Sequence, residues 1–286
     1  MDPPPREAVE AANAQSRRLR ELLHAPGILV MPGAFDALSA LIFQHLGFPA
    51  IQGSSAGFAN ALGHADLSIG RETTVAVTRQ VIEAVRVPVN ADGEDGFGGP
   101  DEVRETVRRF VGIGAAGMNL EDSLHAPGAR RLVPLPQQLE KIAAFTDTRR
   151  ALGSAFLLNA RVDAYAVLRD DPKAALAEAL RRGQAYAEAG ADSVFFAALT
   201  DRGAIRTLAK EIPAPISVFG LPGGPNAREL QELGVARVSY GSAFLRVAAG
   251  AVQRFAKEIR DDGTHDLVHE ALSGADLRAI LAGRRK

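Results

Sequence analysis

The chain contains 286 residues, which is ordinary for one α/β barrel, and 47% of them are hydrophobic while 23% are charged. This balance supports a large buried core and argues against disorder. The 33 basic and 34 acidic residues leave a net charge of −1, and no basic run marks a nucleic-acid surface, so we expect no nucleic-acid partner. The absence of cysteine excludes disulfides, thiolate metal sites and cysteine nucleophiles.

No apolar run approaches the roughly 18 residues that a membrane-spanning helix needs. The first residues, MDPPPREAVEAANAQ, lack the basic and apolar segments of a signal peptide. We therefore expect a cytoplasmic protein with no membrane partner. The same residues predict an N-terminal helical arm, about residues 1–25, whose helix begins near Arg6.

A unit of amphipathic helix, glycine-containing turn and short apolar strand recurs along the chain. Strands that are apolar nearly throughout are typical of a parallel sheet covered on both faces. Eight strands are predicted, at residues 28–32, 49–53, 87–92, 116–122, 155–161, 192–197, 214–220 and 236–241. The clearest helical patterns between them cover residues 36–47, 72–85, 101–114, 135–152, 172–190, 201–212 and 226–234.

Alternating strands and helices indicate right-handed βαβ units, and eight of them favour an α/β fold of the (β/α)8 TIM-barrel type. An open doubly wound sheet is the alternative, but MPGAFDAL after the first strand lacks the Gly-x-Gly-x-x-Gly of a dinucleotide-binding turn. No linker divides the chain, so we expect a single domain of residues 1–286. A C-terminal helical tail, about residues 242–286, exceeds what closing a barrel needs and suits packing on a partner subunit.

Polar residues collect where the predicted strands end, which is the catalytic end of a barrel. Charge concentrates on strands three, four and five. Residues two apart on a strand share a face. Asp92 can therefore point the same way as Asn90, Glu121 the same way as Asn119, and Arg161 the same way as Asn159. The polar positions are Ser54, Ser55, His64 and Asp66 after strand two; Asn90, Asp92, Glu94 and Asp95 at strand three; Asn119, Glu121 and Asp122 at strand four; and Asn159, Arg161 and Asp163 at strand five.

The stretch VPVNADGEDGFGG, residues 87–99, carries three carboxylates within four residues. Because crowded like charges repel, we hypothesise that a cation joins them. Oxygen ligands without a histidine or cysteine cluster favour Mg²⁺ or Mn²⁺ over Zn²⁺. Arg161 would present a planar fork to a carboxylate or phosphate, and residues 53–57 would offer backbone N–H groups to an anion.

Each of these features also has an ordinary structural interpretation. A carboxylate near a strand end commonly caps the next helix, a Gly-Ser-Ser segment is often only a turn, and Arg161 could be a plain ion-pair partner. Their combination on adjacent strands favours a site. His64 is the one histidine predicted near it and is a candidate contact.

These motifs resemble those of the isocitrate lyase and phosphoenolpyruvate mutase superfamily, particularly its methylisocitrate lyase-like members, over roughly residues 28–246. The correspondence runs in chain order. Residues 54–56 are similar to the family's Ser-Gly-Gly-type loop, Asp66 to its Asp after a Leu-Gly pattern, residues 92–98 to Asp-Ala-Asp-Thr-Gly-Phe/Tyr-Gly with Glu94 for the second Asp, residues 120–122 to Ile/Leu-Glu-Asp, and residues 160–164 to Ala-Arg-Thr/Val-Asp/Glu-Ala.

The resemblance implies a Mg²⁺-dependent barrel, with Mn²⁺ as the alternative metal, that binds a small carboxylate substrate. It implies that Asp92 holds the metal while Glu94, Glu121 and Asp66 act largely through water. Arg161, the backbone of Ser54, Ser55 and Ala56, and Phe219 would bind the substrate, and Asp92, Glu121 and Arg161 would be catalytic. It also implies exchange of the last helix between subunits in a homo-oligomer, a dimer or a tetramer assembled as a dimer of dimers.

The chain departs from the family pattern in the half of the site that meets the departing fragment. The lyases carry a Lys-Lys/Arg-Cys-Gly-His loop after strand four, whereas residues 123–131 here contain no cysteine. Their Glu and Asn at the ends of strands six and seven correspond to Ala197 and Phe219. The Lys-bearing gate and the strand-six His of the mutase are not evident. These departures predict a less polar second pocket.

Three functions follow. The first is a carbon–carbon lyase or decarboxylase of a small 2-oxo or 2-hydroxy acid, such as oxaloacetate or a substituted malate, acting through an enolate. The second is phosphorus–carbon bond chemistry, as in a phosphonopyruvate hydrolase or a phosphoenolpyruvate-type mutase, for which Arg130 and Arg131 would supply extra cations. The third, ranked last because Asp92, Glu121 and Arg161 occur together, is a non-catalytic 2-oxo acid binder.

Overall fold

The first strand of the sheet is divided, and this division closes the barrel. The computed structural model describes residues 3–126 and 129–284. Strand β1 (Leu29–Met31) pairs with β11 (Arg237–Ser239), and β2 (Gly33–Ala34) pairs with β3 (Ile51–Gly53). Pro32 separates the two segments, as a residue that cannot donate to a strand ladder. Because β1 and β2 are consecutive in the chain, the nine-segment sheet forms a ring of eight strand positions.

The remaining strands follow in parallel around the ring. They are β4 (Val89–Asp92), β5 (Gly117–Glu121), β8 (Leu157–Val162), β9 (Ser193–Phe196) and β10 (Ile216–Phe219). The register sets Asp92 beside Asn119 and Glu121 beside Arg161, so the charged residues of neighbouring strands lie side by side. The predicted (β/α)8 architecture and all eight predicted strands are confirmed.

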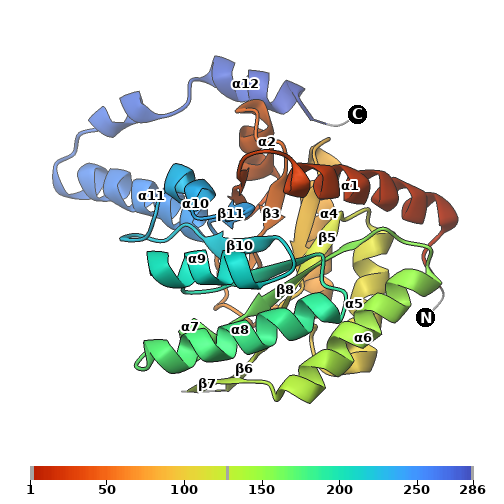
Figure 1. Ribbon diagram of the computed structural model, residues 1–286. Helices are drawn as coiled ribbons and strands as arrows, with labels where there is room; N and C mark the ends of the chain where they lie inside the picture. The colour runs from red at the N-terminus through yellow and green to blue at the C-terminus, as the bar shows by residue number, and fades with distance from the viewer. Residues whose placement is uncertain (1–2, 127–128, 285–286) are drawn as a thin grey trace.

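Helices surround the strands as predicted (Figure 1). Several begin at a polar residue whose side chain accepts a backbone N–H of the first turn, among them Asp36, Asp171, Asp201 and Asn226. Between the strands lie α2 (Ala37–His45), α4 (Gly70–Ala84), α5 (Pro100–Gly112), α6 (Leu135–Ala151), α8 (Pro172–Glu188), α9 (Arg202–Glu211) and α10 (Ala227–Glu232).

One end of the barrel is covered by helix α1 (Arg6–His24), which the sequence predicted. Leu19 and Leu23 of this helix belong to one apolar cluster with Leu29, Ala116 and Leu157, which lie at or just before the starts of three strands. The carboxyl ends of the strands are therefore at the opposite end, where the loops carry the charged residues.

Four short elements were not predicted. They are α3 (Ser55–Ala61), α7 (Ala164–Val167) and a hairpin of β6 (Ser123–Ala126) and β7 (Ala129–Leu132). Each is too short for its hydrophobic periodicity to stand out. The hairpin follows β5 and occupies the place where the sequence predicted a loop; residues 127–128 at its turn lie outside the described residues.

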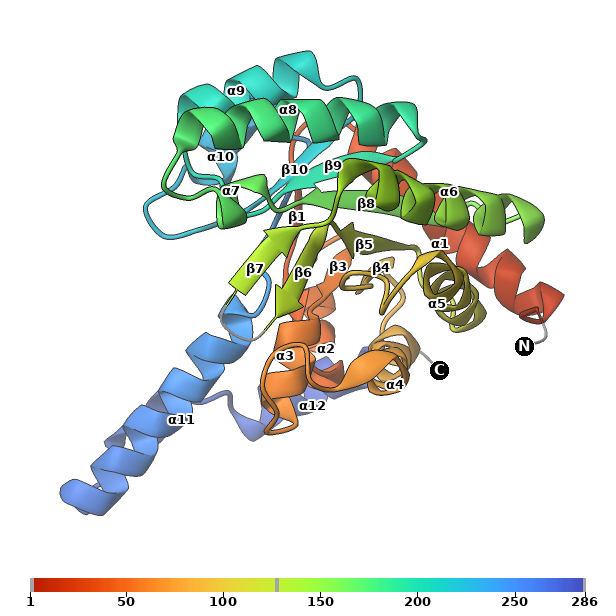
Figure 2. The same ribbon diagram turned by 90° about the horizontal axis from the view of Figure 1, so that it is seen from below.

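The C-terminal tail consists of α11 (Ala243–Asp261), the 3₁₀ helix η1 (Asp266–Glu270) and α12 (Gly274–Ala282). Figure 2 shows α11 projecting away from the barrel, and this helix has no buried residue. The end of the tail returns to α2, where Gln44 Nε2 donates to the carbonyl of Gly283 over 3.1 Å. Among the helices of the described ranges, none has both the length and the apolar character needed to cross a bilayer.

Candidate active site

Asp92 stands at the end of β4 and faces the start of α3. Its Oδ2 accepts hydrogen bonds from the backbone N and the Oγ of Ser55, each over 3.0 Å, and its Oδ1 accepts a longer one of 3.4 Å from the backbone N of Glu94. The preceding Ser54 caps α3 by accepting from the N–H of Gly57. The Gly-Ser-Ser segment is thus a helix start that orients Asp92, and the N–H of Ser55 is directed at this carboxylate.

Glu94 is a buried carboxylate among other carboxylates. It lies in a left-handed backbone conformation (φ 46°), and its carbonyl accepts the N–H of Glu121 over 2.7 Å. Its side chain is 6% exposed, and its Oε1 has no hydrogen-bond partner. Burial, followed by the charges of Asp92, Glu121, Asp66 and Asp95, raises the pKa of Glu94 to about 8. The predicted crowding of negative charge is therefore present.

This raised pKa predicts that metal-free protein loses stability as the pH rises toward about 8. The folded state holds the Glu94 proton more tightly than the unfolded chain, so unfolding releases that proton and becomes more favourable above the usual carboxyl pKa. We expect Glu94→Gln to flatten this dependence in thermal denaturation between pH 5 and pH 9, in roughly the window set by the two pKa values and in the presence of EDTA. Equal pH dependence of variant and parent would contradict the prediction.

Arg161 is held by two carboxylates and two aromatic rings. Its Nη1 donates to Glu121 Oε1 over 2.9 Å, and its Nε donates to Asp163 Oδ1 over 3.0 Å. Its guanidinium carbon lies 5.7 Å from the ring centroids of both Phe195 and Phe219. Burial would lower the pKa of Arg161, but the neighbouring negative charges raise it, so the side chain stays cationic. The guanidinium is fixed at the end of β8 and retains further N–H donors.

Asp163 is an anchor for Arg161. Burial would raise the pKa of Asp163, but the charge of Arg161, the hydrogen bond from Ser123 Oγ and the charge of Arg130 lower it below its usual value. Arg130 Nη1 lies 3.9 Å from Asp163 Oδ1. The hairpin of β6 and β7 thus places two polar side chains, Ser123 and Arg130, against the residue that orients Arg161.

The carboxylate next to Glu121 has a structural role. Asp122 is fully buried; its Oδ2 accepts from Tyr186 Oη over 2.7 Å and from Arg182 Nη1 over 3.1 Å, and its Oδ1 accepts the N–H of Asp163. Arg182 Nη2 also donates to the carbonyl of Val133, which follows the hairpin. This network joins α8 to both ends of the hairpin and to the strand end that carries Arg161.

Asp95 shapes the loop after β4. Its Oδ1 accepts the N–H of Phe97 over 2.9 Å, and Lys141 Nζ lies 2.8 Å from its carbonyl oxygen and 3.6 Å from its Oδ2. Gly93 in the same loop has no room for a side chain, because a Cβ there would lie 2.6 Å from the carbonyl of Asn119. The loop geometry therefore depends on specific residues on both sides of Glu94.

The structure brings most of the predicted site residues to one end of the barrel. Asp92, Glu94, Glu121, Arg161 and Phe219 gather there, with Ser54, Ser55 and Ala56 at the start of α3. Asp66 is exposed but close enough to contribute to the pKa of Glu94. His64 is exposed in the same loop, and its backbone N–H bonds to Ala59.

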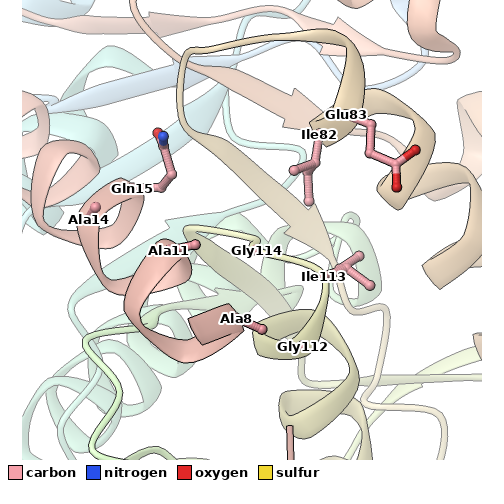
Figure 3. A pocket seen from close by; sticks show the side chains of 9 residues that line it. All are labelled: Ala8, Ala11, Ala14, Gln15, Ile82, Glu83, Gly112, Ile113 and Gly114. Atoms are coloured by element: carbon pink, nitrogen blue, oxygen red, sulfur yellow. The ribbon is translucent and has the colours of Figure 1, made fainter. Parts of the chain in front are cut away.

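Two hollows flank this cluster. One of about 520 Å³ is lined by residues that include Glu94, Asp95 and Leu124, and another of about 510 Å³ lies against Phe219 and Tyr240. A third, also about 510 Å³, is set among α1 and the ends of α4 and α5, at the end of the barrel that α1 covers (Figure 3). The third hollow is lined by one acidic side chain, Glu83, and one amide, Gln15, among small and apolar neighbours, so it has no cluster of carboxylates.

The carboxylates suit a hydrated divalent cation. Within residues 3–126 and 129–284, no three side chains of His, Cys, Asp or Glu lie close enough together to enclose one ion directly. The Oε1 of Glu94 has no hydrogen-bond partner, however, and burial and the neighbouring carboxylates raise the pKa of Glu94, so a bound cation would stabilise its ionised form. Mg²⁺ commonly retains several waters and binds proteins through one or two carboxylates, which fits one direct ligand and further carboxylates acting through water.

Phe195 and Ser123 contact the site but were not predicted. Phe195 lies inside an apolar strand, where nothing distinguishes it from a core residue, and it packs edge-on against Phe219 with centroids 4.6 Å apart. Ser123 follows the Leu-Glu-Asp motif directly, and its position beside that motif was the available signal. Its contact with Asp163 depends on how β5 and β8 pair, which the local sequence does not reveal.

A parallel barrel with fixed acidic groups and a buried arginine at the carboxyl ends of its strands defines an α/β-barrel enzyme of small-anion chemistry. Residues 19–260 match the family model described as phosphoenolpyruvate phosphomutase. The chain belongs to this family, and the resemblance to the isocitrate lyase and phosphoenolpyruvate mutase superfamily is confirmed.

Its relatives include lyases. The chain is 31% identical to the 2-methylisocitrate lyase of Bacillus subtilis (strain 168), covering 92% of this chain and 91% of the relative. It is 34% identical to the 2,3-dimethylmalate lyase of Eubacterium barkeri, covering 86% of both. A crystallised oxaloacetate acetylhydrolase in complex with 3,3-difluorooxalacetate superposes with a TM-score of 0.84 at 26% identity, over 98% of this chain and 95% of that one.

Proposed function

We propose that this protein is a divalent-metal-dependent carbon–carbon lyase of a small 2-oxo or 2-hydroxy acid whose departing fragment carries an apolar substituent. The observation that carries the proposal is the pairing of a crowded carboxylate cluster with Arg161, whose guanidinium lies beside the rings of Phe195 and Phe219. Relatives that act as 2-methylisocitrate lyase and 2,3-dimethylmalate lyase support the reaction class.

In the proposed reaction, Arg161 binds the substrate carboxylate. Glu121 and Asp163 use some of its N–H groups and set the plane of the guanidinium, leaving others for a bidentate contact. Ser54, Ser55 and Ala56 border the same region from the start of α3, and the N–H of Ala56 is proposed as a further donor to the substrate carboxylate. The substrate is thereby oriented before any bond breaks, which is a large part of the catalysis available to a preorganised site.

The metal is proposed to be Mg²⁺ or Mn²⁺, with Asp92 as its direct ligand and Glu94, Glu121 and Asp66 contacting it through water. A bound cation of this kind supplies stabilisation to the negative charge that develops on the substrate oxygen. Ser55 holds Asp92 in position with two hydrogen bonds. In a 2-hydroxy acid, the hydroxyl proton passes to a base as the carbon–carbon bond breaks, and the carbon that carried the hydroxyl leaves as a 2-oxo acid. The electron pair of the broken bond stays on the other fragment as an enolate-type anion, which then takes up a proton.

The apolar half of the site supports a choice of substrate. Ala197 at the end of β9 and Phe219 at the end of β10 present no hydrogen-bonding side chain, and the hollow beside Phe219 continues past Leu221, Pro222 and Tyr240. Beside Ala197 and Phe219 a third carboxylate would lose hydration without a partner, whereas Ser242 and Arg246 supply polar groups only farther along the hollow. This favours alkyl-substituted malates or oxaloacetates over isocitrate.

The test is a panel of substrates that differ in their alkyl substituents and in their number of carboxylates. Purified protein with Mg²⁺ or EDTA is incubated with oxaloacetate, 2,3-dimethylmalate, 2-methylisocitrate and isocitrate, and 2-oxo acid products are quantified by chromatography. We expect metal-dependent cleavage of the alkyl-substituted dicarboxylate 2,3-dimethylmalate and less cleavage of the two tricarboxylates, 2-methylisocitrate and isocitrate. Cleavage of none of the four would reject the proposed activity, and a preference for isocitrate would reject the apolar pocket.

Phosphorus–carbon bond chemistry is the second candidate. The family model is that of a phosphomutase, and Arg130 reaches Asp163 from the hairpin, so one more cation lies near the anion site than the lyase proposal uses. Incubation with phosphonopyruvate, followed by phosphorus NMR, distinguishes the two. Appearance of phosphate or phosphoenolpyruvate would favour this candidate, and an unchanged spectrum would leave the lyase.

We further propose that the chain forms a homo-oligomer through α11, by exchange of this helix in a dimer or tetramer. Val252 and Ile259 of α11 are 69% and 51% exposed, on a helix that contains no buried residue. We predict that Val252→Asp lowers the mass measured by light scattering after gel filtration. Gln253→Asp, one position along on the polar side of the helix, is the control and should leave the mass unchanged; a loss of mass in both, or in neither, would contradict the assignment.

A further inference from the structure

The barrel interior beneath the carboxylates contains a layer of polar side chains. Asn90 Nδ2 donates to Gln52 Oε1 over 2.9 Å and to Asn119 Oδ1 over 3.0 Å, and Asn159 Nδ2 donates to the same Asn119 oxygen over 2.8 Å. Barrel interiors of this type are usually filled by branched apolar residues. These amides come from β3, β4, β5 and β8, the strands whose ends carry the site.

A charged residue completes this layer. Arg237 lies on β11, is 3% exposed, and donates from Nη2 to Gln52 Oε1 across the barrel interior. Its Nε has no hydrogen-bond partner. Since burying an arginine without a hydrogen-bonded carboxylate is costly, a purely structural layer would be better served by a neutral residue.

The positive charge of Arg237 interacts with the carboxylate of Asp92. Burial lowers the pKa of Arg237 to about 9, and the charge of Asp92 opposes this decrease, so the guanidinium is protonated at neutral pH. Gln52, its hydrogen-bond partner, donates to the carbonyls of Gly53 and Ala91, the latter directly before Asp92. The hydrogen bonds to Asp92 itself come from uncharged donors, which are the backbone N–H and the hydroxyl of Ser55 and the backbone N–H of Glu94.

We propose that Arg237 is a built-in counter-charge, a positioning residue that offsets the repulsion among the carboxylates when no divalent cation is bound and that weakens the binding of that cation. This rests on the proposed metal site. Arg161 is shared between Glu121 and Asp163, whereas Arg237 donates to Gln52 inside the barrel, interacts electrostatically with Asp92, and forms no ion pair with a carboxylate among residues 3–126 and 129–284. Arg237 therefore offsets part of the repulsion in the metal-free cluster, and its charge opposes that of an incoming cation.

The test measures cation affinity. Metal-free protein at pH 7.5 is titrated with Mn²⁺ by calorimetry, for the parent, Arg237→Met and Arg237→Lys. Removing one positive charge near a divalent cation should tighten Mn²⁺ binding about tenfold, which corresponds to about 1.4 kcal/mol. Arg237→Lys keeps the charge and should stay within about twofold of the parent. Gln52→Met is the matched control, because it removes the hydrogen bond of Arg237 and leaves its charge.

The outcomes separate the two proposals. Tighter Mn²⁺ binding by Arg237→Met alone supports the counter-charge, because lost packing would weaken binding or leave it unchanged. Unchanged or weaker binding by that variant overturns the counter-charge and leaves the metal site standing. Failure of the parent protein to bind Mn²⁺ overturns both. If Arg237→Met does not fold, Arg237→Gln, which is neutral and can still reach Gln52, replaces it with the same expected result.

Discussion

Replacing Asp92 with alanine is expected to abolish metal-dependent turnover while the barrel remains folded. Asp92 is the proposed direct ligand of the metal, and a metal acting as a Lewis acid contributes several kcal/mol to stabilising the transition state. A loss of more than about 10³-fold in kcat/KM corresponds to about 4 kcal/mol. The substrate is the most active member of the panel above, and Mn²⁺ titration of the same variant should show that binding is lost together with activity.

The controls for this variant separate charge from local structure. Asp92→Ala also frees the N–H and hydroxyl of Ser55, so Ser55→Ala, which removes only the hydroxyl, shows how much activity depends on that contact. Asp101→Ala removes an aspartate whose side chain is 95% exposed at the start of α5 and should leave turnover unchanged. Circular dichroism and thermal denaturation establish that each variant is folded. Full activity in Asp92→Ala would refute the metal assignment.

The sequence predicted the barrel because its information is local and repeated. Each strand is a short apolar run, and each helix is amphipathic with a cap or a glycine at its ends, so eight similar units favour one architecture. The division of the first strand at Pro32 was not predicted. It depends on the two edges that β1 and β2 meet, β11 and β3, which are more than 180 residues apart in the chain.

The site was predicted in its charged half and missed in its supporting half. Asp92, Glu121 and Arg161 were identified because a charged residue at the end of an apolar strand is a strong signal. The ring of Phe195 and the guanidinium of Arg237 were not. Phe195 resembles any core residue. Arg237 is the one charged residue in the apolar strand ARVSYG, and this exception to the strand pattern was a signal that the prediction did not use. Their roles follow from side chains meeting across the barrel, which strand pairing alone determines.

The two arginines differ in their surroundings. Arg161 lies at the end of β8, where Glu121 and Asp163 accept its hydrogen bonds and the ring of Phe195 lies beside its guanidinium. Arg237 lies on β11 inside the barrel, and it donates to the amide of Gln52. In the proposed mechanism, Arg161 therefore exchanges a carboxylate partner during turnover, whereas Arg237 contributes a fixed charge to the site.

Replacing Arg161 with lysine is expected to lower kcat/KM by about 10²-fold or more, mainly through a higher KM, although the positive charge is kept. Lysine cannot supply the planar fork of a bidentate carboxylate contact or place a planar cation against the rings of Phe195 and Phe219. A charge-assisted hydrogen bond contributes about 1.5–3 kcal/mol, so losing one or two accounts for this decrease. Steady-state kinetics over a range of substrate concentrations, together with Mn²⁺ titration, measure the effect.

The metal titration makes this variant diagnostic, because the carboxylate ligands are unchanged. Mn²⁺ should still bind to Arg161→Lys, whereas it should not bind to Asp92→Ala, so the two variants divide the site into a substrate half and a metal half. Lys141→Arg, the reverse substitution at the buried lysine beside Asp95, tests whether exchanging cations near the loop is harmful in itself. Parent-like kcat/KM in Arg161→Lys would show that the substrate carboxylate binds elsewhere. The hollow beside Phe219 and Tyr240 could then no longer be assigned to the departing fragment.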